Sequence, residues 1–294
     1  MILINDKQLV TDSVFSGGEL NVKLPELDLK KGDLVTIDYR SKDPNDLLKL
    51  GLVVNAIHNN YAYLEPKIKL YIPYLPYARQ DRVCSHGEAY GLQFILWYLS
   101  NLGFIDITTR DVHSDVYSKL SDPGKFNATS FIGNISFMNQ LAELGIALED
   151  LVRVSPDKGA LNRVRKILLD VPRDCQRFYP WYDFYRYYRS SPILEVEKER
   201  IDGGVKSTIK TLLPIENCNL LIIDDICDGG ATFIDLARQL SKCDPKSITL
   251  FVTHGIFRNG TNDLYDAGIT RIITTDSLPQ TLTNHKGEFH VFKI

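Results

Sequence analysis

The residues best suited to chemistry lie in the segment Leu220–Phe233, LLIIDDICDGGATF, where four apolar residues run into two aspartates. A third aspartate, two glycines, an alanine and a threonine follow. Glycines let the backbone turn so that successive N–H groups face one anion, and a helix N-terminus adds partial positive charge. The expected phosphate-binding residues are Gly229, Gly230, Ala231 and Thr232.

The three acids beside this turn need a different partner, because carboxylates repel phosphate. Carboxylates accept hydrogen bonds from hydroxyl groups and bind magnesium through oxygen. A sugar phosphate satisfies both halves of the segment, so we add Asp224, Asp225 and Asp228 to the expected sugar-phosphate site. The alternative is that the aspartates only cap the following helix, which accounts for one or two of them.

The elements that position these residues follow an alternating pattern. Short apolar, β-branched runs predict buried parallel strands over 33–39, 68–75, 104–113, 151–157, 219–225, 247–255 and 269–277. Amphipathic stretches predict helices over 45–59, 90–102, 158–169 and 232–242. We therefore expect an α/β fold with mainly parallel sheets. A strand ending at Ile223 would lead into the turn Asp224–Ala231, at the sheet edge where ligands bind in such folds.

The composition narrows the class of protein. The chain has 294 residues, 44% of them hydrophobic and 24% charged, which suits one large domain or two modest ones. Its net charge of -3 gives no bulk attraction to nucleic acid or to an anionic membrane. Five cysteines without close pairing favour a reducing, cytoplasmic setting. We expect neither a signal peptide nor a run of about 18 apolar residues that could span a membrane.

Several segments together resemble one family. The segment IIDDICDGGATF resembles the phosphoribosyl-diphosphate motif of type I phosphoribosyltransferases and ribose-phosphate diphosphokinases. The segment PYARQDR resembles the diphosphokinase segment whose Arg-Gln pair contacts ATP. Other family-like stretches follow in family order: VFSGGE (14–19), RDVHSD (110–115), VSPDKGALNRVR (154–165), EKER (197–200) and THGIFRNG (253–260). This order favours the diphosphokinases, because a phosphoribosyltransferase leaves the ATP segments without a purpose.

The resemblance implies a magnesium-dependent transfer of the β,γ-diphosphate of ATP to the C1 hydroxyl of ribose 5-phosphate. It implies a mobile catalytic loop with Lys198 and Arg200, and a magnesium site with His113 and Asp157. His113 would also be catalytic. The implied ATP contacts are Phe15, Glu19, Arg79, Gln80, Arg82 and His113.

The resemblance also implies an architecture of two type I phosphoribosyltransferase-like domains related by a pseudo-twofold axis. The expected domains are 1–131 on the ATP side, with the last strand in 283–294 returning to it, and 132–282 on the sugar-phosphate side. The family further implies a homo-oligomer built from dimers, with a hexamer left open.

Two departures from the family concern the acceptor. The family loop usually reads Asp-Thr-Gly-Gly-Thr, and Gly229 stands where the first threonine would be, which we expect to leave room. The stretch Phe178–Arg189 is additional and rich in aromatic residues and arginine. Both favour ADP-ribose as an alternative acceptor, yielding ADP-ribose 1-diphosphate for NAD synthesis. Its contacts would be Phe178, Trp181, Tyr182, Tyr185, Arg186 and Arg189.

Other interpretations stay open. Ribose 5-phosphate remains the first choice of acceptor, and the aromatic stretch is then a packing or subunit-contact surface. A non-catalytic regulatory subunit is a further alternative. The presence of Lys198 and Arg200 speaks against it, because such subunits tend to lose these residues.

Overall fold

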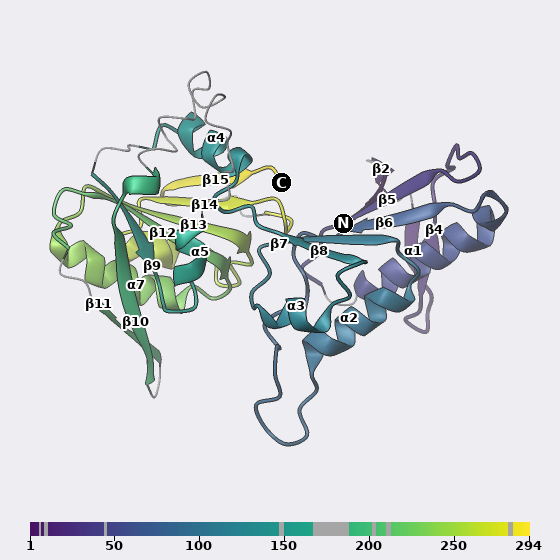
Figure 1. Ribbon diagram of the computed structural model, residues 1–294, viewed down its shortest axis with the longest axis horizontal. Helices are drawn as coiled ribbons and strands as arrows, with labels where there is room; N and C mark the ends of the chain where they lie inside the picture. The colour runs from purple at the N-terminus through teal and green to yellow at the C-terminus, as the bar shows by residue number, and fades with distance from the viewer. Residues whose placement is uncertain are drawn as a thin grey trace. The chain divides into compact units, whose positions relative to one another are not determined.

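The protein is described by a computed structural model that covers residues 1–5, 7–8, 11–43, 46–146, 150–166, 188–201, 204–209, 213–281 and 285–294. The chain divides into two compact units (Figure 1). Unit 1 comprises Met1–Thr129 and Ser277–Pro279, and unit 2 comprises Ser130–Asp276 and Gln280–Ile294. In the covered residues, no helix is both long enough and apolar enough to cross a membrane.

Unit 1 is built on a mixed sheet with the strand order β2-β1-β5-β6-β7-β8. Strands β5 to β8 run parallel, whereas β1 is antiparallel to both of its neighbours, and β3 pairs with β4 in a separate hairpin. The strands are β1 Ile2–Ile4, β2 Lys7–Gln8, β3 Thr11–Val14, β4 Leu20–Lys23, β5 Leu34–Tyr39, β6 Lys67–Tyr71, β7 Asp106–Arg110 and β8 Phe126–Thr129. The helices are α1 Asp46–Tyr61, the 3₁₀ turn η1 Ala62–Leu64, α2 Gly91–Asn101 and α3 Val116–Leu120.

Helices α1 and α2 lie against each other and supply much of the unit 1 core. Leu50, Val53 and Ile57 of α1 recur every three or four residues and are fully buried. A Cβ at Gly51 would lie only 2.5 Å from the Tyr98 hydroxyl of α2, so glycine allows the close approach. The Tyr98 hydroxyl in turn donates a 2.9 Å hydrogen bond to the Leu47 carbonyl.

Unit 2 is built on a sheet with the order β11-β10-β9-β12-β13-β14-β15, in which only the β10–β11 pair is antiparallel among the described strands. The strands are β9 Leu151–Ser155, β10 Ile193–Ile201, β11 Gly204–Ile209, β12 Asn219–Cys227, β13 Ser247–Gly255, β14 Arg271–Thr275 and β15 Glu288–Phe292. The helices are α4 Ile135–Glu143, α5 Leu161–Arg165, α7 Ala231–Leu240, the 3₁₀ turn η3 Ser241–Cys243 and α8 Asn262–Asp266.

The central strands of unit 2 are covered on both faces. In β13, Leu250 and Val252 belong to one buried cluster and Phe251 to another, so successive side chains enter cores on opposite sides of the sheet. This burial explains the nearly continuous apolar sequence of the strand. The predicted α/β class with mainly parallel sheets is confirmed, whereas the pseudo-twofold axis stays a prediction.

The last strand differs from the expectation. β15 pairs in parallel with β14, so it extends the unit 2 sheet instead of returning to unit 1. Phe292 is buried and packs in the cluster that contains Phe131, Phe137 and Phe251. The buried ring of this short strand therefore packs within unit 2.

Candidate active site

The strand that carries the paired aspartates is longer than expected. β12 continues through Asp224 and Asp225 to Cys227, because its parallel pairing with β13 persists to the end of that strand. The turn is therefore only Asp228–Gly230, and the expected boundary at Ile223 is wrong. Asp224 and Asp225 stand at the carboxyl end of a central strand, with Asp225 buried and Asp224 largely buried.

The turn ends at Gly230, which has φ +83° and precedes the first residue of α7. Only glycine adopts this left-handed backbone without strain. Because the N-cap residue is a glycine, it has no side chain to occupy the N–H groups of the first helical turn. The simple capping explanation therefore does not describe this helix start, since none of the three aspartates occupies the N-cap position.

A basic residue that the sequence reasoning did not single out lies between the two acids. Arg163 of α5 donates to Asp224 Oδ1 at 2.6 Å, and the same nitrogen, Nη1, lies 3.1 Å from Asp225 Oδ1. Its side chain is only 14% exposed, so the ion pairs are shielded from water. The sequence alone carried no signal for this contact, because α5 follows β9 and only the folded sheet places β9 beside β12.

One guanidinium does not balance the acids at this edge. Burial, followed by the charge of Asp225, raises the pKa of Asp224 well above its usual range, although Arg163 acts in the opposite direction. The charge of Asp157 also contributes to the increase. The site is thus short of positive charge and suits a ligand that donates hydroxyl hydrogens or carries a cation.

Asp157 lies just beyond β9. Its Oδ1 accepts the Ala160 N–H at 2.9 Å, and its carbonyl accepts the Ser155 hydroxyl at 2.8 Å. Among the residues that the structure describes, no group of three or more His, Cys, Asp or Glu side chains could hold a metal ion by itself.

The space beside Gly229 is not open as expected. A Cβ on this glycine would lie 3.1 Å from Arg258 Nη2 and 3.3 Å from Asn259 Nδ2. The amide of Asn259 donates to the Gly229 carbonyl at 3.3 Å, and the Arg258 Nε lies 3.8 Å from Asp228 Oδ1. The space left by the missing side chain at position 229 is therefore occupied by the side chains of Arg258 and Asn259. The expectation that Gly229 leaves free room for a larger substrate is wrong.

A second site lies in unit 1, where a cavity of about 460 Å³ opens beyond the carboxyl ends of β5 and β6. Its lining residues are Ser41, Lys42, Asp43, Tyr74, Pro76, Tyr77, Arg79 and Gln80. Two of the expected ATP contacts, Arg79 and Gln80, thus share one cavity. Tyr77 has φ +62°, a strained backbone for a non-glycine residue and one that clusters at ligand sites.

The lining of this cavity differs from the expected ATP contacts at Lys42 and Arg82. Lys42, which the sequence reasoning missed, lines the cavity, and partial burial lowers the pKa of its ammonium group although the residue as a whole is exposed. Arg82 is not among the lining residues, and its exposed Nε lies 3.8 Å from Asp81 Oδ1. The cavity therefore contains the Arg79–Gln80 pair but not the whole expected set.

The remaining expected ATP contacts of unit 1 lie on its surface. Phe15 and Glu19 stand in the turn of the β3–β4 hairpin, where the Phe15 N–H donates to the Glu19 carbonyl at 2.9 Å. Phe15 is 59% exposed, so its ring is available to stack on a partner. His113 follows β7 and is exposed, which places it in unit 1 whereas Asp157 belongs to unit 2.

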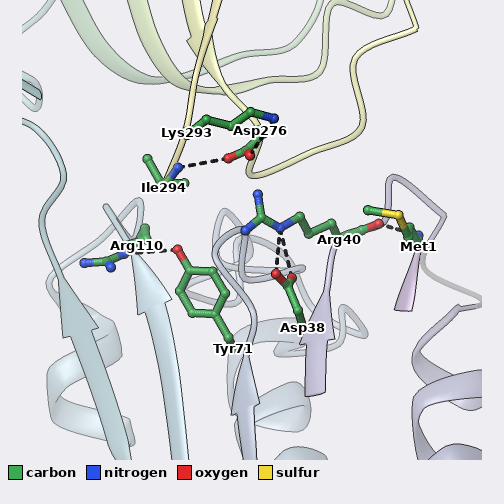
Figure 2. A network of polar contacts seen from close by, with 8 residues as sticks. All are labelled: Met1, Asp38, Arg40, Tyr71, Arg110, Asp276, Lys293 and Ile294. Carbon is green, nitrogen blue, oxygen red and sulfur yellow. Dashed lines mark hydrogen bonds and ion pairs between the residues drawn. The ribbon is translucent and has the colours of Figure 1, made fainter. Parts of the chain in front are cut away.

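A cluster of aromatic and charged groups marks the strand ends of unit 1 (Figure 2). The guanidiniums of Arg40 and Arg110 lie 5.5 Å and 5.7 Å from the centroid of the Tyr71 ring. Asp38 accepts from Arg40 Nε at 2.9 Å. The figure also draws the C-terminus of unit 2, where the Ile294 N–H donates to Asp276 Oδ1 at 3.0 Å.

The expected catalytic loop has a strand backbone. Lys198 and Arg200 lie in β10 and face Ser207 and Val205 of β11 in antiparallel register. Their side chains lie outside the described part of the structure, so their catalytic role stays a prediction. The charged sequence EKER was predicted to form a loop, but its pairing with β11 gives it the backbone of a strand.

Most of the aromatic stretch also lies outside the described residues, including Phe178, Trp181, Tyr182, Tyr185 and Arg186. Its end is described. Tyr188 is fully buried, contacts Phe137 edge-on at 6.1 Å, and lies beneath the Arg153 guanidinium at 4.9 Å. Arg189 is exposed. The described end thus packs into unit 2, in keeping with the packing interpretation for that end.

Comparison with known proteins finds ribose-phosphate pyrophosphokinases among the relatives, although no family model matches the chain. A ribose-phosphate pyrophosphokinase of Mycoplasma pneumoniae is 26% identical over 294 residues, covering 97% of this chain and 81% of that protein. One of Sulfolobus acidocaldarius is 24% identical and covers 95% and 88%, respectively. One of Methanothermobacter thermautotrophicus is 29% identical over 212 residues, covering 72% and 66%.

A solved structure agrees with the fold. The crystal structure of phosphoribosylpyrophosphate synthetase from Mycobacterium smegmatis superposes with a TM-score of 0.73 at 20% identity, covering 96% of this chain and 85% of that one. At this identity the likeness concerns the fold. With the sequence relatives, it agrees with the resemblance drawn from the motifs: this chain is similar to ribose-phosphate pyrophosphokinases over most of its length.

Proposed function

We propose that the protein transfers the β,γ-diphosphate of ATP to the C1 hydroxyl of a ribose 5-phosphate moiety and releases AMP. The observation that carries this proposal is the pair Asp224 and Asp225 at the end of β12, directly before a glycine turn and a helix start. The similarity to ribose-phosphate pyrophosphokinases supports an enzyme of this type. The cavity with Arg79 and Gln80 supports a nucleotide as the other substrate.

The acceptor would be held by both halves of the β12–α7 segment. Its phosphate takes the N–H groups at the start of α7, and its ring hydroxyls donate to Asp224 and Asp225. Arg163 keeps these carboxylates in place. This orientation presents the C1 oxygen as the nucleophile, and positioning is a large part of catalysis in phosphoryl transfer.

In the reaction, the C1 oxygen forms a bond to the β-phosphorus of ATP and loses its proton, while the bond from that phosphorus to the α,β-bridging oxygen breaks and AMP leaves. Negative charge accumulates on the transferred phosphoryl oxygens. Lys198 and Arg200 on β10 would neutralise it, and Arg200 would bind two oxygens at once. By the family resemblance, Asp157 and His113 would be ligands of a magnesium ion, which would supply further neutralising charge.

The test measures AMP release by the purified protein with ATP and magnesium, supplied with ribose 5-phosphate or with ADP-ribose. We expect AMP to appear with at least one acceptor and to disappear in the Lys198→Ala/Arg200→Ala double variant, which excludes a contaminating enzyme. The preferred acceptor identifies the substrate. If neither ribose 5-phosphate nor ADP-ribose supports AMP release, the proposal is overturned and a regulatory subunit is favoured.

A further inference from the structure

The segment that follows β13, residues 256–260, is fixed to the turn after β12. The N–H groups of Ile256 and Phe257 both donate to the Cys227 carbonyl, at 2.9 Å and 3.1 Å. The Arg258 N–H donates to the Asp228 carbonyl at 3.0 Å. Phe257 is buried and contacts Phe289 of β15 edge-on, which anchors the segment from the other side. The backbone of Arg258 is thereby held beside the turn.

The side chain of Arg258 lies close to the turn and forms only a long, exposed ion pair there. Its contact with Asp228 joins Nε and Oδ1 at 3.8 Å, and the Arg258 side chain is 70% exposed, so this pair contributes little. Nη2 lies on the side of Gly229, 3.1 Å from where a Cβ would be. A guanidinium is thus present where a side chain at position 229 would otherwise stand.

We propose that Arg258 binds the phosphate on C5 of the acceptor and replaces the hydroxyl that family members have at the position of Gly229. The inference rests on the proposed function. A guanidinium offers two parallel donors and a full charge, which suits phosphate oxygens better than a single hydroxyl does. Gly229 is then a specificity-determining position because it lets Arg258 approach, not because it leaves the turn empty.

The first experiment compares wild type with Arg258→Ala in steady-state kinetics and in calorimetric titration with the preferred acceptor. Losing a charged hydrogen bond to phosphate should raise the acceptor KM and Kd by roughly 10-fold or more, with the ATP KM unchanged. The acceptor KM and Kd of Arg258→Lys should lie between those of wild type and Arg258→Ala, since lysine keeps the charge but loses the bidentate geometry. The matched control is Arg238→Ala, which removes an exposed arginine from the last turn of α7.

A second variant separates a phosphate contact from a structural role. In the Arg258→Ala background, Gly229→Thr should recover several-fold in acceptor affinity, because its hydroxyl can enter the vacated space. In wild type, the same substitution should weaken acceptor binding, because its Cβ meets the Arg258 and Asn259 side chains. A merely structural Arg258 would give no such rescue.

The outcomes distinguish the two proposals. If wild type releases AMP and Arg258→Ala retains the wild-type KM and Kd for the acceptor, the inference is wrong and the proposed function stands. If wild type releases no AMP but binds a sugar phosphate, calorimetry on the same variants still decides the role of Arg258. If wild type binds neither ribose 5-phosphate nor ADP-ribose, both proposals fail.

Discussion

At the scale of residues, Arg163 and Arg258 stand beside the acids and the glycines of the β12–α7 segment. Asp224 and Asp225 were recognisable because three carboxylates next to a glycine turn are unusual. Arg163 lies 61 residues before Asp224, which it contacts, and Arg258 lies 30 residues after Asp228 (258 − 228). Such contacts depend on which strands become neighbours, and a single sequence does not state this.

The raised pKa of Asp224 leads to a prediction about stability. Its folded-state pKa lies above the ordinary 3.8, so ionisation costs folding free energy. This cost is absent below about pH 3.8 and grows as the pH rises through the folded-state pKa. Asp224→Asn should therefore raise the melting temperature at pH 8 and change it little at pH 4, while lowering acceptor affinity.

The measurement is thermal unfolding of both proteins across that pH range. Glu216→Gln, which removes an exposed carboxylate from the same unit, is the control and should behave like wild type at every pH. An Asp224→Asn protein that melts at or below the wild-type temperature at pH 8 would contradict the explanation.

At the scale of elements, periodicity predicted the buried strands better than the edges. β13 was expected at 247–255 and is found there, because every residue after the first is buried. The hairpins β3–β4 and β10–β11 were missed. Their strands are charged or short, and their structure comes from pairing, which leaves little trace in local composition.

The turn between β12 and α7 gives a matched pair of variants. Gly230→Ala places a side chain at φ +83°, with its Cβ 3.3 Å from Leu264 Cδ2, so it should cost about 1–2 kcal/mol. Gly229→Ala meets only the ends of the Arg258 and Asn259 side chains and should cost less. Chemical denaturation of both variants measures the difference. Equal losses would show that backbone conformation is not what selects glycine at position 230.

At the scale of the whole molecule, each unit has a hydrophobic core of its own. The unit 1 cluster includes Ile37, Ile57 and Leu70, and the unit 2 clusters include Ile222, Leu250 and Phe251. Family resemblance suggested the two units, but it assigned the last strand to the wrong one. The predicted homo-oligomer and the cytoplasmic setting stay predictions.

The position of β15 can be tested through its alternating side chains. Phe292→Ala removes a buried ring from unit 2 and should destabilise that unit by about 3–5 kcal/mol. Val291→Ala, at a neighbouring position that is 37% exposed, should have a small effect. Hydrogen exchange should accelerate in β12–β14 and stay unchanged in β5–β7. Acceleration in β5–β7 instead would restore the original assignment of the strand.

The separate cores have a consequence for how such proteins diverge. The Arg79–Gln80 cavity and the β12–α7 turn each lie on a framework that folds around its own interior. Among the described residues, the buried clusters beneath the two sites have no member in common, and Gly229 meets the side chains of Arg258 and Asn259. Under the proposed function, a lineage can therefore exchange one sugar phosphate for another by changes in unit 2, while the donor site in unit 1 is inherited unaltered.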